Sequence, residues 1–292
     1  MYSNKLYTPL RYPGGKARFA PLIAAVIREN GLEGGHYLEP YAGGAGVALE
    51  LLFDGVVDRV HINDADPAVA MFWRAATRHS KQLRDLVARE PVTMDAWRHW
   101  RAVMLGLTPA NEVEQGFATL FMNRTNRSGI LKGGVIGGQA QQGRYKLSER
   151  FIRDRLCERL ERIAANSSRI HVYEEDARAL LLRCHSFLST RSLIYLDPPY
   201  YIKGEGLYRN YYEHEDHVRV AAALRSKRFR RPWIVSYDNV AEIRQMYAYA
   251  RSLTYGLHYT AQRRYTGSEV MFFSDRLKVI PIADAGNFLA AA

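Results

Sequence analysis

The stretch HYLEPYAGGAGVALELLF, residues 36–53, decides how this chain folds. Its apolar beginning predicts a short strand, and the apolar spacing of its second half predicts a helix. Between them, Gly43, Gly44 and Gly46 predict a tight turn. Such glycines often serve the turn alone, but a glycine-rich turn from strand to helix also lets a nucleotide-like ligand approach bare backbone.

Acidic residues on both sides of this turn favour the ligand-binding interpretation. Glu39 and Pro40 directly precede the glycines, and Asp64 ends the next predicted strand 18 residues after Gly46. A carboxylate about 20 residues beyond such a turn is placed to accept hydrogen bonds from ribose hydroxyls. Asp64 could instead cap the following helix, although Asp66 is better placed for that role.

Strands and helices alternate on both sides of this stretch. Helical spacing predicts helices over 17–30, from 65 onward, and over 177–188, 214–226 and 240–248. Apolar runs predict strands over 56–64, 169–176, 192–197, 232–239, 252–260 and 269–275. The alternation predicts an α/β fold, a mostly parallel sheet with helices on both faces.

The middle of the chain has a different character. Residues 80–106 and 151–166 have the spacing of amphipathic helices, whereas residues 122–151 are rich in glycine, glutamine and basic residues. Two strand-like pieces around VIGG, residues 135–138, predict a hairpin. We therefore expect a small helical and hairpin insert over 75–165, which divides a larger domain into residues 1–74 and 166–292.

Charge points to the partner of this insert. The chain carries a net charge of +11 and has a pI near 9.6. The segment from Arg74 to Leu160 holds 16 basic and 8 acidic residues, so eight of the eleven net charges lie there. Such an excess favours a polyanion such as nucleic acid, although a merely solvated basic face would look the same. The 19 tyrosines are a second indication, because aromatic rings stack on bases.

Several classes of protein do not fit the sequence. No run of about 18 apolar residues predicts a membrane span, and the N-terminal residues lack the apolar core of a signal peptide. Cys157 and Cys184 have neither metal-binding nor redox spacing, so we expect two reduced cysteines, no metal and a cytoplasmic location.

A second stretch, SLIYLDPPY at residues 192–200, carries the chemistry. Proline cannot donate to a sheet, so the strand must end at Leu196 or Asp197. The side chain of Asp197 and the carbonyl of Pro198 could accept hydrogen bonds from the amino group of adenine, with Tyr200 stacked on the base. If that amino group is methylated by an activated methyl donor, the protein needs only to orient the donor and the base. The alternative is a strand-end turn with a capping aspartate.

The order of eight motifs makes the interpretation specific. The motifs are RYPGGK, EPYAGGAG, HIND, NRTNRSGIL, GRYK, EEDA, DPPY and VSYD. In this order the chain resembles the Dam-type adenine-N6 DNA methyltransferases. The resemblance implies a Rossmann-like methyltransferase fold with a target-recognition insert, S-adenosylmethionine as the methyl donor, and site-specific methylation of an adenine flipped out of double-stranded DNA.

The resemblance also implies roles for individual residues. The donor site would comprise Tyr12, Lys16, Glu39, Tyr41, Gly43, Gly46, Asp64 and Asp176, with Asp64 on the ribose and Asp176 on the donor's adenine. The reaction site would comprise Asp197, Pro198, Pro199 and Tyr200. The DNA contacts would come from Arg124, Asn126, Arg127, Lys132, Gln139, Arg144 and Tyr145.

Within the insert, glutamines and basic residues have different expected roles. Gln139, Gln141 and Gln142 could pair with adenine edges in the major groove, whereas lysines and arginines would contact phosphates. The tyrosine-rich residues 201–216 predict a loop that closes over the flipped adenine, or a plain surface loop.

Two other functions are compatible with parts of the pattern. An RNA adenine methyltransferase would have the same sheet and donor site, and a non-catalytic DNA-binding module would keep the basic insert. We expect a monomer or a weak dimer. A restriction endonuclease partner and the target DNA sequence are left open.

Overall fold

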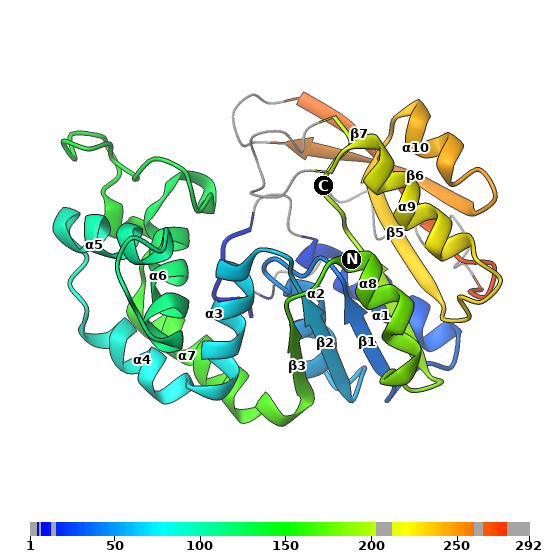
Figure 1. Cartoon of the computed structure of the whole chain (residues 1–292), viewed down its shortest axis with the longest axis horizontal. Coiled ribbons are helices and arrows are strands. Elements are labelled where there is room, and N and C mark those ends of the chain that lie inside the picture. The colour runs from blue at the N-terminus through cyan, green and yellow to red at the C-terminus, as the bar shows by residue number, and fades with distance from the viewer. Residues whose placement is uncertain (1–4, 6, 13–15, 203–211, 260–264, 279–292) are drawn as a thin grey trace.

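The computed structural model describes residues 5, 7–12, 16–202, 212–259 and 265–278, and these residues build one seven-stranded sheet (Figure 1). The strand order is β3-β2-β1-β4-β5-β7-β6. Of these seven strands, β7 runs in the direction opposite to the other six. The strands are β1 His36–Glu39, β2 Arg59–Asn63, β3 Ile170–Tyr173, β4 Ser192–Leu196, β5 Trp233–Asp238, β6 Arg251–Tyr259 and β7 Tyr265–Phe273. The predicted mostly parallel sheet is confirmed.

Helices cover both faces of the sheet, as the sequence predicted. Side chains of α1 Ala20–Glu29, α2 Gly46–Phe53 and α3 Pro67–Arg78 pack in one hydrophobic cluster with one face. Side chains of α8 Ala177–Arg183, α9 His214–Arg225 and α10 Ala241–Met246 pack in a second cluster with the other face. The first helix begins later than predicted, because residues 17–19 form a 3-10 turn and α1 starts at Ala20.

Strand β4 shows how the two clusters divide the sheet. Leu193 and Tyr195 belong to the first cluster, while Ile194 and Leu196 belong to the second. Alternate side chains of a strand point to opposite faces, so a strand covered on both sides is apolar throughout. All of β4 is buried, and it ends at Leu196 as the following prolines require.

The carboxyl ends of β1 and β4 form the topological switch point of the sheet. From β1 the chain passes to β2 and β3 on one side, and it returns to β4 on the other side of β1. In open α/β sheets, ligands bind in the crevice at such a point. The glycine turn follows β1 here and Asp197 follows β4, so the fold brings the two decisive stretches together.

Four further helices form most of the insert, on the left of Figure 1 beside the edge that ends in β3. They are α4 Ser80–Arg89, α5 Met94–Met104, α6 Glu112–Thr125 and α7 Arg153–Ala165. Their aromatic residues, among them Trp97, Phe117 and Phe121, belong to the same hydrophobic cluster as the first face of the sheet. The insert therefore shares a continuous core with the sheet.

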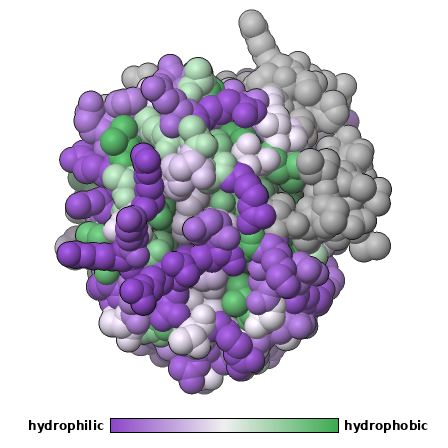
Figure 2. Space-filling model, turned by 90° about the vertical axis from the view of Figure 1, so that its right-hand side faces the viewer, coloured by the Kyte–Doolittle hydropathy of each residue, from purple (hydrophilic) through white to green (hydrophobic). Residues whose placement is uncertain are grey.

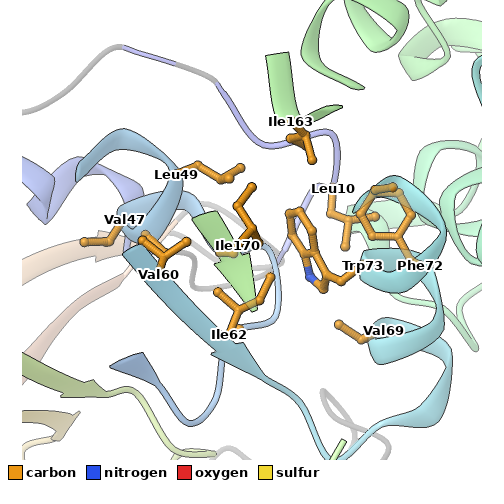
Figure 3. Close-up of a cluster of buried hydrophobic side chains, with 14 of the residues drawn as sticks. Leu10, Val47, Leu49, Val60, Ile62, Val69, Phe72, Trp73, Ile163 and Ile170 are labelled. Carbon is orange, nitrogen blue, oxygen red and sulfur yellow. The ribbon is translucent and has the colours of Figure 1, made fainter. Parts of the chain in front are cut away.

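The N-terminal segment contributes to this shared core. Figure 3 shows Leu10 beside Phe72 and Trp73 of α3 and below Ile163 of α7. All four side chains are almost completely buried. Leu10 thus fixes the segment Thr8–Tyr12 across the junction between sheet and insert. Figure 2, turned by 90° from the view of Figure 1, shows a face that is mainly hydrophilic, with small and scattered hydrophobic patches.

The prediction of a hairpin is wrong, because the structure has no strand among the described residues 126–146. Residues 126–146, which we call the recognition segment, contain turns and one isolated antiparallel bridge between Asn126 and Val135. The segment has positive φ angles at Gly129, Gly137 and Gly138, a backbone conformation that a regular strand does not use. Glycine content therefore produces a compact loop in place of a β ladder.

Two other expectations can be compared with the fold. Cys157 and Cys184 are both free, and Cys184 is buried, which agrees with packing roles. Among the helices of the described ranges, none combines the length and apolar character that crossing a bilayer would need.

Candidate active site

The glycine turn after β1 has a backbone that larger residues would strain. Gly43 and Ala45 both have positive φ, 45° and 47°. A Cβ atom added to Gly43 would lie 2.7 Å from the ring of Tyr12, so the tyrosine packs directly on the turn. The buried Trp73 donates from Nε1 to the carbonyl of Gly43 at 2.9 Å. The turn is thus held from two sides, and this explains the requirement for glycine at position 43.

Asp64, at the end of β2, reinforces the same turn. Its two carboxylate oxygens accept hydrogen bonds from the backbone N–H groups of Gly43 and Asp66, each at 2.9 Å. Burial raises the pKa of Asp64 to about 7, although both backbone donors oppose the rise. Asp66 caps α3 by accepting from the N–H of Ala68, as the sequence predicted. Asp64 is therefore available to a ligand at the turn.

Glu39 is the last residue of β1 and is only 5% exposed. Its Oε1 accepts hydrogen bonds from Tyr37 and from the N–H of Ala48 in the first turn of α2, both at 3.1 Å. Burial raises the pKa of Glu39 to about 8, against the effect of these two donors. Glu39 and Asp64 are consequently two acids whose charge a cationic ligand would favour.

Asp197 lies just beyond β4 and faces Lys16. Lys16 Nζ is 3.1 Å from Asp197 Oδ1, and the Ser236 hydroxyl donates to the same oxygen at 2.8 Å. Burial raises the pKa of Asp197, while the positive charge of Lys16 opposes that rise. Burial alone would lower the pKa of Lys16, but Asp197 and Glu269 together hold it well above its ordinary value. Lys16, which the resemblance placed in the donor site, thus neutralises the carboxylate of Asp197.

Tyr200 occupies a different place from the one expected. The sequence predicted a ring stacked on the base, but Tyr200 is 5% exposed and its hydroxyl donates to Glu269 Oε1. Lys16 Nζ donates to the same hydroxyl at 2.9 Å. Glu269, in β7 and completely buried, also accepts from Tyr255 at 2.7 Å. The Tyr200 hydroxyl therefore helps to hold the ammonium group of Lys16 in place. We call Lys16, Asp197, Tyr200, Ser236 and Glu269 the reaction centre.

One cavity of about 480 Å³ joins the glycine turn to the reaction centre. The predicted residues that line it are Tyr12, Lys16, Glu39, Tyr41, Gly43, Gly46, Asp64, Asp197 and Pro199. This volume lies within the usual range for small-ligand pockets. Asp176 is exposed and caps α8 through the N–H of Ala179, next to Ala177, which lines the cavity. The structure thus gathers nearly all predicted donor-site residues into one space.

The predicted DNA-binding residues divide into exposed and buried groups. Arg127, Lys132, Gln139, Arg144 and Tyr145 are exposed. Asn126 is fully buried, and its side chain bonds Trp97 and the carbonyls of Ile130 and Leu131. These bonds shape the recognition segment from inside, so in this structure Asn126 does not present its side chain to DNA. Arg124 is 8% exposed and lines the cavity instead of the outer surface.

The three glutamines also differ from one another. Gln142 is exposed like Gln139, but Gln141 turns inward. Its amide nitrogen donates to the carbonyls of Ile136 and Gly138, each at 2.7 Å. Its amide oxygen accepts from the N–H of Leu147 at 2.9 Å. The expected pairing of Gln141 with an adenine edge is therefore replaced by a role in closing the loop.

Sequence reasoning missed three polar residues on the last strands. Ser236 and Glu269 complete the reaction centre, and Asp238 accepts from the N–H groups of Tyr201 and Ile202 at 2.9 and 3.1 Å. Asp238 thereby fixes the chain just after DPPY. The available signal was a lone polar residue within an apolar strand, such as the glutamate of SEVMFF, residues 268–273. Of the predicted closing loop, residues 203–211 lie outside the described residues.

No group of three or more histidine, cysteine, aspartate or glutamate residues within the described part of the chain has a geometry suited to a metal ion. The cavity is lined by carboxylates, one lysine, several arginines and aromatic rings.

The chain was compared with protein-family models, curated proteins and solved structures. The family model of the D12 class N6 adenine-specific DNA methyltransferases matches residues 12–264, which is most of the chain. A search of curated proteins returns no match. Among solved structures, the rRNA methyltransferase aviRa from Streptomyces viridochromogenes is similar at 16% sequence identity and a TM-score of 0.38. That alignment covers 94% of this chain and 89% of that chain.

Proposed function

Because the chain belongs to the D12 class N6 adenine-specific DNA methyltransferase family, we propose that the cavity between the glycine turn and Asp197 holds the methyl donor and the target adenine together. The enzyme transfers a methyl group from S-adenosylmethionine to the N6 of adenine in DNA. The observation that supports our assignment of residues is the continuity of the cavity from the glycine turn to Asp197. A methyl group can pass only between groups that share one space.

At the donor end, we assign the ribose to Asp64 and the methionine part to Glu39, Tyr41 and the glycine turn. The oxygens of Asp64 each accept one backbone hydrogen bond and retain a lone pair for a hydroxyl. Glu39 lies buried where a sulfonium would favour its ionised form. Asp176, at the rim, would accept from the donor's adenine amino group. Tyr12, whose ring packs on the glycine turn, would also contact the donor.

At the acceptor end, Asp197 accepts a hydrogen bond from the N6 amino group of the extruded adenine. This bond, with a second to the carbonyl of Pro198, draws the nitrogen lone pair out of conjugation with the ring. S-Adenosylmethionine supplies a methyl group activated on a sulfonium, so the chain needs to provide orientation and no nucleophile of its own. As the nitrogen lone pair forms the new bond to carbon, the carbon–sulfur bond of the donor would break and its sulfur would leave as a neutral thioether. The amino group would then release one proton, through Asp197, to solvent.

The positive charge of Lys16 favours the ionised form of Asp197, whose carboxylate can then accept a hydrogen bond. Its ammonium is buried between Asp197 and Glu269, 3.1 and 3.6 Å from their oxygens. An acceptor that became protonated would donate to the amino group and oppose the reaction. Tyr200 and Ser236 hold the lysine and the aspartate at their positions, so we assign them positioning roles. The base plane would then be held by Pro199 and by aromatic residues at the cavity wall.

The target is double-stranded DNA, in our proposal, because an adenine inside a duplex reaches Asp197 only after it leaves the stack. The exposed Arg127, Lys132, Gln139, Arg144 and Tyr145 of the recognition segment would contact the duplex around it. We propose that the enzyme acts in the cytoplasm as a monomer or a weak dimer, with or without a restriction endonuclease as partner.

The test is to treat a long DNA of known sequence with enzyme and donor, and to map the modified adenines by sequencing. We expect N6-methyladenine within one short recurring sequence, and no modification by the variant Asp197→Ala. Equal methylation of structured RNA, or unchanged methylation by Asp197→Ala, would contradict the assignment. Calorimetry with S-adenosylmethionine checks that the variant still binds the donor, as we expect.

A further inference from the structure

Five arginines line the cavity in addition to the predicted donor-site residues. They are Arg11, Arg124, Arg150, Arg155 and Arg159. They come from four places in the chain: the N-terminal segment, α6, the 3-10 turn Leu147–Arg150, and α7. Their convergence is therefore a product of the tertiary structure. The resemblance to the family placed only Arg124 among functional residues.

None of these five guanidinium groups forms an ion pair with any residue that the structure describes. Elsewhere the chain does pair its arginines, as at Arg74 with Glu174 and Arg183 with Glu175. Glu158 is the acid whose charge acts favourably on Arg159, and it too forms no ion pair with it. The five arginines therefore line the cavity without a direct ion pair to any described acid.

The cost of this arrangement is visible at Arg124. It is 8% exposed, and burial together with the charges of Arg159, Arg11 and Arg150 lowers the pKa of Arg124 to about 9. Arg11 Nη1 is buried, and no described group accepts a hydrogen bond from it. Like charges that are buried together destabilise the fold unless an anion joins them. The cluster thus has the electrostatics of an anion site.

The arginines are also held in place by neutral groups. Arg124 Nε donates to the carbonyl of Pro9 at 2.6 Å, and Arg159 donates to the carbonyl of Thr8 at 2.9 Å. The backbone of Arg11 exchanges two hydrogen bonds with the side chain of Asn123. Because carbonyls and amides carry no net charge, these bonds orient the guanidinium groups without neutralising them. The site is built before any ligand arrives.

We propose that this arginine cluster binds the phosphodiesters that flank the extruded adenine nucleotide. The proposal rests on the proposed function, since it takes the adenine at Asp197 as given. A nucleotide whose base lies in the cavity must have its own backbone phosphates nearby. Two phosphates can pair with several guanidinium groups, whereas the single carboxylate of the donor cannot pair with all of them. The cluster thereby holds the distorted backbone while the base is out of the stack.

The experiment compares two double variants that remove the same charge. Arg150→Gln with Arg155→Gln removes two exposed arginines of the cluster, and Lys227→Gln with Arg228→Gln removes two exposed cations from the loop between α9 and β5. Binding of a duplex of arbitrary sequence is measured over a range of salt concentrations. We expect the slope of log affinity against log salt to become shallower by about 0.9 for each lost phosphate contact, in the cluster variant alone.

A second measurement locates the phosphates. Methylphosphonate linkages, which carry no charge, replace the phosphates on either side of the target adenine in the mapped sequence. We expect wild-type affinity to fall about tenfold and the affinity of the cluster variant to fall much less. Equal losses in both proteins, or equal salt slopes in both double variants, would overturn the proposal.

Two controls separate this inference from the proposed function. Asp197→Ala should keep the full salt slope even though it methylates nothing, so failure of the chemistry leaves the cluster testable. Calorimetry with S-adenosylmethionine should give the cluster variant the donor affinity of the wild type. A comparable loss of donor affinity would instead assign the arginines to the donor and overturn the proposal.

Discussion

The reaction centre and the recognition segment are built on opposite principles. In the reaction centre, polar side chains from the N-terminal segment, β5, β7 and the end of β4 are largely buried and bond one another. In the recognition segment, the side chains proposed to touch DNA are exposed, and only Asn126 and Gln141 bond inward to hold the loop. The proposed chemistry thus lies in a buried network at the ends of strands, and the proposed contacts with the target lie on an exposed loop.

This difference suggests how each region tolerates change. When one member of a buried network is removed, its direct partners are left unsatisfied, and this cost fixes the geometry of the network. An exposed side chain on a loop can be replaced with little cost to folding. We therefore expect target preference to be alterable in the recognition segment without loss of the methylation chemistry.

The largest expected effect follows from Asp197→Ala. Loss of the acceptor for the amino group should lower the methylation rate of the bound complex by about 10³-fold, the scale of a removed transition-state contact. In the recognition segment, Arg144→Gln should weaken DNA binding yet leave the rate at saturating DNA nearly unchanged. Single-turnover kinetics measure both. A comparable rate loss in Arg144→Gln would break the division between the two regions.

The next effect concerns Glu269, which touches no reacting atom in our proposal. Glu269→Gln keeps a hydrogen-bond acceptor for Tyr200 but removes one of the two charges that hold Lys16. We expect kcat to fall roughly tenfold, equivalent to about 1.4 kcal/mol, with little change in KM. The pH profile of kcat should also shift, because Lys16 and Asp197 are coupled through this charge. An altered KM with unchanged kcat would mean that Glu269 has only a structural role.

Two glycines compare the regions directly. Gly43→Ala must place a Cβ atom 2.7 Å from the Tyr12 ring at a positive φ, so we expect about 1–2 kcal/mol of destabilisation and a donor affinity about tenfold weaker. Gly134→Ala, in the recognition segment, has open space around its Cβ and should change stability by less than about 0.5 kcal/mol. Thermal unfolding and calorimetry measure the pair. Similar losses for both would contradict the distinction.

The smallest effect is a dependence of donor affinity on pH. The pKa of Asp64 lies at about 7 and that of Glu39 at about 8, so both hold protons in the free enzyme below these values. A cationic donor favours the carboxylates, so binding releases protons and affinity should rise, by up to about tenfold, from pH 6 to 8. The same raised pKa values mean that the contribution of these groups to stability falls as pH rises from about 4 to 8.

Calorimetry in buffers of different ionisation enthalpy counts the released protons. Glu39→Gln should remove the upper part of the pH dependence while Asp64 keeps the lower part. A donor affinity that stays constant from pH 6 to 8 in the wild type would show that neither carboxyl group changes its protonation on binding.

Local signals in the sequence determined the alternation of strands and helices, the glycine turn, the end of β4 before its prolines, and the helix cap at Asp66. Each depends on residues a few positions apart, because periodicity, turn conformation and the missing N–H of proline act over short distances. The motif order then identified the family and predicted which residues bind the donor.

Only the tertiary structure decided the partners of those residues. Lys16 and Tyr200 are 184 positions apart. They meet because the segment at Lys16 and Ala17 packs on the glycine turn after β1, and β1 lies beside β4 in the sheet. Glu269 enters the reaction centre because β7 inserts beside β5, and the arginine cluster forms where the insert meets the N-terminal segment. Long-range contacts depend on how elements pack, and packing is a property of the whole core that no short stretch of sequence contains.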